Sequence, residues 1–482
     1  MTHNRQPKKD YDAIIVGSGP NGLAAGITLQ QAGLSVLILE AKSKIGGGLR
    51  SGELTLPGFV HDFCSAIHPL AVASPYFQSL PLGEHGLKFL YPEIALAHPF
   101  DDGSAIQLLP SLQDTATGLG ADARAYRKIM QPLVASWPGI REDVLAPLHF
   151  PGRPLDMVHF GMKALSSATQ FSKRFRTEKA RGFWGGLAVH SQVPFTHLAS
   201  SAIGLVLLTA GHMRGWPVAA GGSQSIANAL ASFFKSIGGK IEVNQPVKTL
   251  DQLPSSDAVL LDITPVQLLE ITGNRLSPLY RWQLSRYRYG MGTFKIDWAL
   301  AGRIPFKSET ANNAGTLHLG GTFNELAAAE WDAWSGKHPA KPAVILAQQS
   351  IADPGRAPNG RHTGWAYCHV PAGSTMDMTE AIESQVERFA PGFRDLILAR
   401  HTMNTEALET YNANYVGGDI SGGANNLFQL FARPALRWAP YRSSIRGIYL
   451  CSASTPPGGG VHGMCGYHAA KRALREVFKM KV

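Results

Sequence analysis

The chain has 482 residues, of which 44% are hydrophobic and 17% charged, and its formal net charge is +10. This length favours two subdomains over a single hydrophobic core, and this composition excludes an intrinsically disordered chain. The positive charge suits an anionic partner, such as a membrane surface or a negatively charged cofactor. The sequence has no helix-turn-helix or zinc-finger spacing, so nucleic acid is not expected as a partner.

Cysteine usage and the apolar segments bear on the cellular compartment. The four cysteines lie far apart and form no CxxC pair: Cys64, Cys368, Cys451 and Cys465. This pattern is typical of reduced, buried thiols in a cytoplasmic protein. The first residues, MTHNRQPKKDYD, lack the apolar stretch of a signal peptide. The most hydrophobic run, residues 201–210, is about half as long as a membrane span requires. We therefore expect a cytoplasmic protein that does not cross a membrane.

The N-terminal residues carry a nucleotide-binding pattern. Residues 13–16 are a short apolar run that ends at a glycine, as a buried parallel strand does. Gly17, Gly19 and Gly22 then form a GxGxxG motif at the start of an alanine-rich helix. The first glycine of such a motif permits a tight turn, the second admits a pyrophosphate, and the third lets the helix pack on the strand. The free N–H groups of the helix N-terminus favour an anion there.

An acidic residue follows this motif at the expected distance. A second strand is predicted at residues 35–39, and Glu40 ends it about twenty residues after the glycines. A carboxylate in this place can hold the two hydroxyls of an adenosine ribose and would repel a 2′-phosphate. Strand, loop, helix, strand and acid occur in order, which favours a dinucleotide site over a similar unit with nothing bound.

The glycine run 46–48 indicates which dinucleotide is bound. A nicotinamide-binding motif normally ends at the acid, whereas this chain brings a second glycine cluster to the site. Such a cluster resembles that of FAD proteins in the carotenoid desaturase and amine oxidase superfamily. Members of that superfamily usually read GGR here. This chain has Gly48 at the arginine position and Arg50 two residues later, so a phosphate contact from Arg50 remains open.

The middle of the chain contains a second unit of the same kind. An amphipathic helix is expected after Gly221 and Gly222, followed by a strand in residues 240–250 with a break at Pro246 and a core strand in residues 257–265. Residues 76–214 between the two units have mostly helical and turn patterns. Residues 281–415 are rich in predicted strands, and Trp298, Trp365 and Tyr367 are expected to form the floor of a substrate domain.

Segment 153–186 combines apolar residues with a run of positive charge that only Glu178 opposes. Its apolar residues are Leu155, Val158, Phe160, Met162, Leu165 and Phe171, and its cations are Lys173, Arg174, Arg176, Lys179 and Arg181. Such a segment could lie on an anionic membrane surface. A solvated helix of the substrate domain is the alternative, and the sequence favours it.

Over nearly its whole length the chain resembles the phytoene desaturase-like FAD-dependent oxidoreductases, and within them the phytoene dehydrogenase-like branch. The motifs that carry this resemblance are the N-terminal pattern and GWPVAAGGSQSIANAL, FKIDWAL, WAYCHVP, ERFAPGF, NYVGGDI and IYLCSASTPPGGGVHG. The resemblance implies an α/β fold with a Rossmann-like FAD-binding domain of the GR2 type. It implies that residues 10–75, 215–275 and 425–482 form this domain, and that residues 76–214 and 276–424 form an inserted α+β substrate or cap domain.

The motif and the resemblance together predict a set of FAD-binding residues. These are Gly17, Gly19, Pro20, Asn21, Gly22, Glu40, Ala41, Lys42, Gly47, Gly48, Leu49, Arg50, Val247, Ser454, Gly460, Val461 and His462. By resemblance, the backbone near Val247 would meet the adenine. The run Gly458–Gly460 is expected to let the backbone pass beside the flavin, and the helix from about Gly463 to point its N-terminus at the flavin. Many FAD enzymes have an acid where this chain has Ala453.

Three histidines are candidates for proton transfer near the flavin. His61 and His68 lie in a segment that passes the flavin in similar proteins, and an imidazole suits the removal of a proton near neutral pH. His462 stands where carotenoid desaturases have proline and is the first choice for catalysis. Polar lining of the pocket is the alternative for all of them. Neither the group His61, Asp62, Cys64 and His68 nor the group His462, Cys465 and His468 has the spacing of a metal site, so no metal is expected.

The expected function is the removal of a hydride and a proton from an apolar or amphiphilic substrate, such as a carotenoid, isoprenoid or lipid, to form a double bond. A first alternative is a flavin oxidase that passes electrons from amines or other polar substrates to oxygen, with Phe428, Phe431, Trp438 and Tyr441 as aromatic lining. A second is a non-catalytic scaffold that binds flavin or lipid. The sequence leaves the substrate, the electron acceptor and the oligomeric state open.

Overall fold

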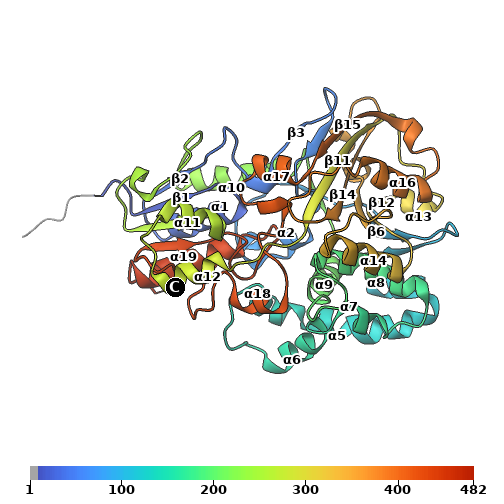
Figure 1. Cartoon of the computed structure of the whole chain (residues 1–482), viewed down its shortest axis with the longest axis horizontal. Helices are drawn as coiled ribbons and strands as arrows, with labels where there is room; N and C mark the ends of the chain where they lie inside the picture. The colour runs from blue at the N-terminus through green and yellow to red at the C-terminus, as the bar shows by residue number, and fades with distance from the viewer. Residues whose placement is uncertain (1–8, 482) are drawn as a thin grey trace, which may run out of the picture.

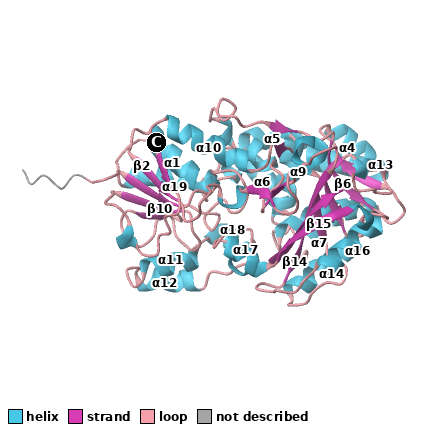
Figure 2. Cartoon of the chain, turned by 90° about the horizontal axis from the view of Figure 1, so that it is seen from above, coloured by secondary structure: helices cyan, strands magenta, loops and turns pink. Residues whose placement is uncertain are grey.

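The computed structural model describes residues 9–481, which form two large sheets packed against helices and two small two-stranded sheets. The large sheets lie at opposite ends of an elongated molecule, with the N- and C-terminal elements together at one end (Figure 1). Seen from above, helices flank both large sheets and loops connect the two ends (Figure 2). None of the described helices is long and apolar enough to cross a membrane.

The first sheet has five parallel strands in the order β16-β10-β1-β2-β9. The strands are β1 (Ala13–Val16), β2 (Val36–Leu39), β9 (Lys240–Glu242), β10 (Ala258–Leu261) and β16 (Ile448–Leu450). The central three are fully buried runs of apolar residues, as parallel strands covered on both faces should be. Three separated parts of the chain thus build one sheet, and its carboxyl edge collects the loops that follow each strand.

Helices cover both faces of this sheet. On one face lie α1 (Pro20–Gln31), α10 (Gln224–Ser236) and α19 (Met464–Glu476), and on the other lie α11 (Pro265–Thr272) and α12 (Pro278–Ser285). Helix α10 buries Ile226, Leu230 and Phe234 as its amphipathic pattern predicts. The predicted strand 240–250 ends earlier than expected, at Glu242, because Asn244 has φ 58° and the chain turns back so that Gln245 N–H donates to the Glu40 carbonyl.

The second sheet has seven strands in the order β15-β11-β14-β13-β12-β6-β7, antiparallel except for the pair β12–β6. They are β6 (Ile94–Pro99), β7 (Ala105–Leu108), β11 (Gly292–Leu300), β12 (Ala314–Leu319), β13 (Val344–Ala347), β14 (His362–Val370) and β15 (Ile397–Met403). Strands β6 and β7 belong to the part expected to be mostly helical. Their apolar runs are too short for periodicity to separate a buried strand from a helix. Their structure is decided by the pairing of β6 with β12 and of β7 with β6.

Helices pack on both faces of the second sheet. Helix α16 (Thr379–Phe389) covers one face, and a helical group covers the other: α4 (Leu112–Gly118), α5 (Ala123–Val144), α6 (Pro154–Ala164), α7 (Ala168–Ser172), α8 (Glu178–Ala188), α9 (Ala202–Arg214) and α14 (Phe323–Trp334). The most hydrophobic run of the sequence falls in α9, where most of its residues are buried in the core. Its apolar character thus reflects packing inside the molecule.

Short elements complete the structure. The helices are α2 (Pro69–Ala73), α3 (Pro75–Gln78), α13 (Glu309–Asn312), α15 (Gln349–Ala352), α17 (Thr405–Tyr411) and α18 (Leu427–Ala432). The strands are β3 (Ser51–Glu53) paired with β4 (Val60–Asp62), and β5 (Phe89–Leu90) paired with β8 (Val218–Ala219). The hairpin β3–β4 and helix α2 carry the chain from the first sheet toward the second.

Candidate functional site

A cavity of about 850 Å³ extends from the carboxyl edge of the parallel sheet to the second sheet. Its volume lies in the usual range for ligand sites, about 300–1,000 Å³. Its first part is lined by the loops after β1, β2, β10 and β16, and its second part by residues of α9, β12, β13 and β14. The carboxyl edge of an open parallel sheet is where such folds bind their ligands.

The glycine-rich loop at residues 17–22 has the geometry that a dinucleotide requires. Gly17 has φ 100°, and a Cβ on Gly22 would overlap the carbonyl oxygen of Gly17. Helix α1 therefore packs directly on the end of β1. Gly17, Gly19, Pro20 and Asn21 line the cavity, whereas Gly22 lies behind it as the packing position.

Glu40 lies at the end of β2 and lines the same cavity. Its carboxylate accepts hydrogen bonds from the backbone N–H groups of Ser18, at 3.0 Å, and Lys42, at 2.9 Å. Arg50 forms a buried ion pair with it at 3.0 Å and also donates from Nε to the Lys44 carbonyl at 2.7 Å. The guanidinium of Arg50 thus binds Glu40 and the Lys44 carbonyl, whereas the sequence had left open a contact from Arg50 to a phosphate. Ala41, Lys42, Leu49 and Val247 also line this part.

Segment 411–415, just after α17, closes the cavity over the second glycine cluster and was not predicted from the sequence. Tyr411 donates its hydroxyl to the Gly47 carbonyl at 2.7 Å. A Cβ on Gly48 would overlap the hydroxyl of Tyr415, and a Cβ on Gly47 would lie 3.1 Å from Gly19 Cα. Tyr415 therefore explains why this chain has glycine where similar proteins have arginine. The motif NYVGGDI was the available signal, but its role depends on a contact distant in sequence.

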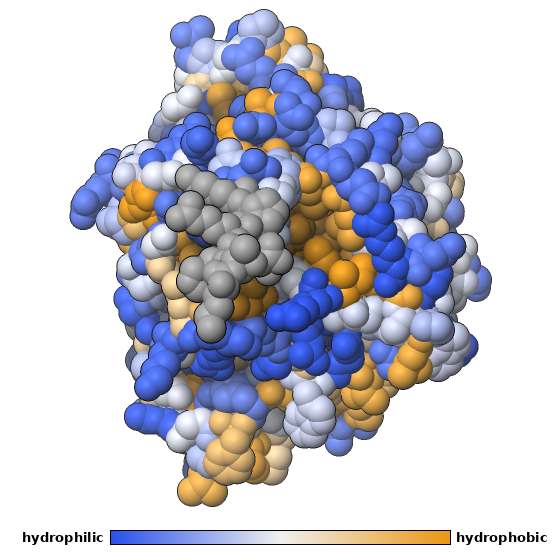
Figure 3. Space-filling view, turned by 90° about the vertical axis from the view of Figure 1, so that its left-hand side faces the viewer, coloured by the Kyte–Doolittle hydropathy of each residue, from blue (hydrophilic) through white to orange (hydrophobic). Residues whose placement is uncertain are grey.

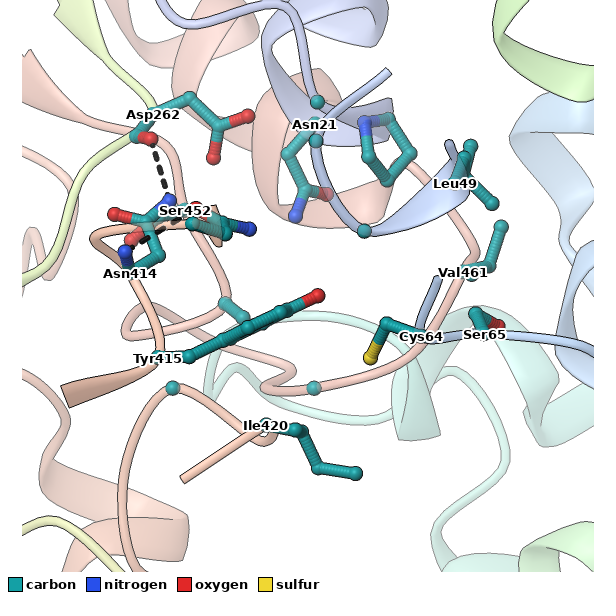
Figure 4. A pocket seen from close by; sticks show the side chains of 18 of the residues that line it. Asn21, Leu49, Cys64, Ser65, Asp262, Asn414, Tyr415, Ile420, Ser452 and Val461 are labelled. Carbon is teal, nitrogen blue, oxygen red and sulfur yellow. Dashed lines mark hydrogen bonds between the residues drawn. The ribbon is translucent and has the colours of Figure 1, made fainter. Parts of the chain in front are cut away.

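Asp262 is a second cavity residue that the sequence analysis missed. It follows β10, is 8% exposed, and its Oδ2 accepts a hydrogen bond from the Gly22 N–H at 3.0 Å. Asn414 donates to its backbone carbonyl at 2.9 Å, as Figure 4 shows. Burial, reinforced by the charge of Glu40, raises the pKa of Asp262 to about 7, against the lowering effect of the Gly22 N–H. The strand 257–265 was predicted, but nothing in its sequence marks Asp262 as part of a site.

The C-terminal glycine run contacts both the cavity and neighbouring backbone. Gly459, Gly460 and Val461 line the cavity, together with Ser454. A Cβ on Gly459 would lie 2.9 Å from the carbonyl oxygen of Ser421. The hydroxyl of Ser454 donates to the Gly422 carbonyl at 2.7 Å. Close packing against segment 421–422 thus requires glycine in this run, independently of any flavin that binds beside it.

His462 does not take the position expected for a catalytic residue. It is 1% exposed, lies outside the cavity lining, and its Nδ1 accepts the Met464 N–H at 3.0 Å, capping the start of α19. Burial lowers the pKa of His462 to about 4. The neighbouring Cys465 and His468 turn to other partners, the carbonyls of Thr455 and Leu145. Among residues 9–481, no group of three or more potential metal ligands converges.

The other two candidate histidines are placed differently from each other. His61 is fully buried outside the cavity, with Nε2 bonded to the Thr55 hydroxyl at 2.8 Å and Nδ1 3.6 Å from Asp297. The prediction that His61 lies beside a bound ligand is therefore wrong. His68 lines the cavity, and its Nε2 bonds to the Ser223 hydroxyl at 2.8 Å. Burial lowers the pKa values of both His61 and His68 to about 4.

The second part of the cavity is apolar and aromatic. It is lined by Ile203, Leu207, Trp216, Thr316, Ile345, Ala347, Trp365 and Tyr367. Trp365 and Tyr367 contact each other edge to face at 5.2 Å between centroids, on the face predicted as a floor. Trp298 does not belong to this floor, because its indole points to the opposite face, where Nε1 donates to Glu383 at 2.9 Å.

His190 brings an imidazole to this apolar part and was not predicted. It lies in the turn after α8, is half-buried and lines the cavity. Its Nε2 is hydrogen-bonded to Nε2 of the buried His318 at 2.9 Å. Burial, and to a smaller extent the charge of His369, lowers the pKa of His190 to about 3. The ring is therefore neutral at physiological pH.

The aromatic residues assigned to the amine oxidase alternative do not line the cavity. Trp438 is fully exposed, and Phe428 and Phe431 are exposed on the surface of α18. Tyr441 is buried and donates its hydroxyl to the Pro456 carbonyl at 2.9 Å. The prediction that these four residues line the cavity is therefore wrong, since three of them face solvent and Tyr441 packs against the loop that contains Pro456.

Comparison with known sequences supports the nucleotide-binding character of the N-terminal unit. Residues 15–80 match the NAD(P)-binding Rossmann-like domain family. The mouse pyridine nucleotide-disulfide oxidoreductase domain-containing protein 2 is 26% identical over 99% of this chain and 95% of its own length. A limonene dehydrogenase subunit from Castellaniella defragrans is 22% identical over 97% of this chain and 95% of its own length.

Solved structures share the whole architecture. An oxidoreductase from Methanosarcina mazei has a TM-score of 0.64 at 15% identity, over 95% of this chain and 99% of its own. Putrescine oxidase bound to putrescine has a TM-score of 0.61 at 17% identity, over 98% of this chain and 99% of its own. Together with the parallel sheet built from separated segments, these similarities confirm the predicted α/β fold with a Rossmann-like domain and an inserted α+β part.

Proposed function

We propose that the chain is an FAD-dependent oxidoreductase that removes a hydride and a proton from adjacent carbons of an apolar or amphiphilic substrate, leaving a double bond. One observation carries this proposal: a single cavity joins a dinucleotide-binding loop to an apolar compartment. The similarity to the mouse protein over nearly the whole chain supports the coarser statement that the chain is an oxidoreductase.

The residues present fit FAD. The loop at residues 17–21 and Gly47 would hold the diphosphate, Glu40 the ribose hydroxyls, and the backbone near Val247 the adenine, since all of them line the first part of the cavity. Bound FAD would supply the hydride acceptor. The segments 452–454 and 459–461 would flank its other end and exclude water from it.

The apolar compartment supports an apolar substrate. Its lining holds no carboxylate to pair with an ammonium group, and the charged lining residues, Glu40, Lys42, Arg50, Lys248, Asp262 and Glu270, belong to the first part. The buried cation of Lys295 lies 6.0 Å from the ring of Trp365, which disfavours a second cation on that ring. One relative is named as part of a limonene dehydrogenase.

The test is reduction of the bound flavin in the absence of oxygen. The purified chain, reconstituted with FAD, is mixed anaerobically with limonene or with putrescine, and loss of flavin absorbance is followed. We expect an apolar donor such as limonene to bleach the flavin and putrescine to leave it oxidised. Bleaching by putrescine with peroxide release in air would instead support the amine oxidase alternative. A bound flavin that no donor reduces would support the scaffold alternative.

A further inference from the structure

The carboxyl group of Asp262 lies among the backbone groups that would bind a diphosphate. Its Oδ2 accepts the N–H of Gly22 at 3.0 Å, and a Cβ on Gly19 would lie 2.7 Å from the same oxygen. Figure 4 shows the side chain of Asp262 extending from the end of its strand toward Asn21, at one side of the cavity. An acidic group thus stands where an anion is expected to bind.

An ionised Asp262 carboxylate and a bound diphosphate would repel each other. Little water separates them, so the repulsion is screened far less than at a surface. A protonated carboxyl group removes the conflict, because it carries one O–H donor and still has an acceptor oxygen. The acceptor oxygen can still accept the hydrogen bond from the Gly22 N–H while the O–H donates to a phosphate oxygen. Only the protonated form therefore satisfies both neighbours.

We propose that Asp262 is a cofactor-binding residue that acts in its protonated form, donating its O–H to the diphosphate of the bound dinucleotide while accepting the Gly22 N–H. This inference rests on the dinucleotide binding of the proposed function and extends it to the protonation state of one residue. It makes the affinity for FAD depend on pH through a group that touches no part of the flavin ring.

The groups around Asp262 leave it as the residue that titrates near neutral pH. Burial together with the nearby Glu40 raises the pKa of Asp262 to about 7. Glu40, at the end of β2, is paired with Arg50. Cys451 after β16 and Cys465 of α19 also face it, and burial raises the pKa of Cys465 to about 12 and that of Cys451 well above its usual value. Both thiols stay neutral where Asp262 titrates.

The sign of the pH effect follows from this assignment. The dinucleotide binds the protonated form, so raising the pH through the pKa of Asp262 depopulates the binding-competent form. The apparent Kd for FAD then rises by up to about tenfold per pH unit above that pKa, and it is flat well below it. Binding of FAD in turn strengthens the hold of Asp262 on its proton.

The experiment measures the Kd for FAD by flavin fluorescence in the wild-type chain and in Asp262→Asn, from about pH 6 to about pH 9. Carboxylates of ordinary pKa stay ionised throughout this pH range. Asparagine has nearly the same shape and offers a permanent N–H donor beside its acceptor oxygen, so it mimics the protonated acid. We expect the wild-type Kd to rise with pH and the Asp262→Asn Kd to stay constant and be lower than wild type at the alkaline end. A flat wild-type profile, or an equal slope in Asp262→Asn, would overturn the proposal.

A second measurement needs no variant, should Asp262→Asn fail to fold. ADP-ribose carries the diphosphate as a diester that does not titrate in this pH range, and adenosine carries no phosphate, so the wild-type Kd for ADP-ribose should rise with pH while that for adenosine stays flat. Equal slopes would assign the titration to a group at the ribose and reject Asp262. Binding of FAD and ADP-ribose without a pH slope contradicts only this inference, whereas a chain that binds neither contradicts the proposed function as well.

Discussion

At the scale of single residues, Gly22 shows how the absence of a side chain permits the close packing on which the proposed cofactor site depends. Because a Cβ there would overlap the Gly17 carbonyl oxygen, Gly22→Ala must push α1 away from β1. Overpacking of this kind costs about 1–3 kcal/mol, and here it also displaces the loop that is proposed to bind the diphosphate. We expect the purified variant to lose its FAD and to melt at lower temperature, as measured by flavin absorbance per protein and by thermal unfolding.

Gly161→Ala is the matched control for that variant. Gly161 lies inside α6 with open space where its Cβ would stand, and its φ is negative. Alanine is favoured over glycine by about 0.5–1 kcal/mol in a helix, so this variant should retain FAD and be slightly more stable. Full flavin content in Gly22→Ala would contradict the packing role given to Gly22.

His190 is the residue-scale candidate for proton removal, because its neutral imidazole faces the apolar compartment and His318 orients it. A positioned general base contributes about 10²–10⁴-fold to a rate. We expect His190→Gln to slow anaerobic reduction of the flavin by about 100-fold or more with the donor that reduces the wild-type chain, and to leave FAD affinity unchanged.

His68→Gln tests the second lining histidine in the same assay. If His68→Gln slows flavin reduction and His190→Gln does not, His68 is the base that removes the proton, and His190 only lines the cavity. His462→Ala serves as a reference for a structural role, since its imidazole caps α19. It should lower the melting temperature and leave reduction of the remaining bound flavin at its normal rate.

At the scale of elements, a buried ion cluster ties the two halves of the molecule together. Asp62 of β4 pairs with the fully buried Arg356, which also binds Asp353 at 3.1 Å, while the N–H of Ser223 before α10 donates to Asp62 at 2.7 Å. Burial alone would raise the pKa of Asp62, but Arg356 and these hydrogen bonds outweigh it and hold the pKa below its usual value. This cluster fixes the hairpin β3–β4 beside the cavity.

Removal of the cation should unfold this region. Arg356→Met leaves a buried carboxylate without its partner, which costs about 3–5 kcal/mol. Because the pKa of Asp62 is depressed in the folded state, its contribution is present above its unfolded pKa and is lost as the pH falls through the folded value. Urea unfolding should therefore show a large loss of stability at neutral pH that shrinks in acid.

An exposed pair is the control for that cluster. Arg394 bonds to Glu380 at 2.7 Å on the surface of α16. Arg394→Met should change the free energy of unfolding by less than about 1 kcal/mol, because water screens the pair. A similar loss for Arg356→Met and Arg394→Met would remove the special role given to the buried cluster.

At the scale of the whole molecule, one surface combines apolar and basic side chains. Helix α6 and the loop before it expose Leu155, Val158, Met162 and Phe150, which are 59–86% accessible and lie beside Arg153, the partner of Asp156 at 3.8 Å. Hydrophobic residues gather at the lower end of Figure 3, the end where Figure 1 places α6. Phe160 and Phe171 of the predicted segment are instead buried.

We expect this surface to contact anionic membranes, because buried apolar area and attraction of cations add in such binding. The double variant Leu155→Ser/Met162→Ser should float several-fold less with vesicles that contain phosphatidylserine than the wild-type chain does. Leu398→Ser, on β15 at the opposite end of Figure 1, is the control and should float normally. Equal flotation of all three proteins would leave α6 as an ordinary exposed helix.

Much of the fold could be predicted from local patterns. Strands β1, β2 and β10 and helix α10 were expected at or close to their observed positions, because short apolar runs and amphipathic periods depend on neighbours along the chain. Strands β6 and β7 were missed, since β6 joins the sheet through β12, which lies far away in sequence, and β7 pairs only with β6. Most of the predicted lining residues around the two N-terminal glycine clusters do line the cavity, whereas two of the three candidate histidines do not.

The sequence by itself determined the nucleotide-binding loop, because its glycines, its helix start and its acid are neighbours whose backbone conformations follow from residue type. Tertiary structure alone decided which side chains face the cavity. Tyr415 meets Gly48, Asp262 meets Gly22, and His190 meets His318 only after distant segments pack together. A histidine four residues after Gly458 in sequence looked catalytic, yet packing turned it into a helix cap, because side-chain direction depends on the fold around it.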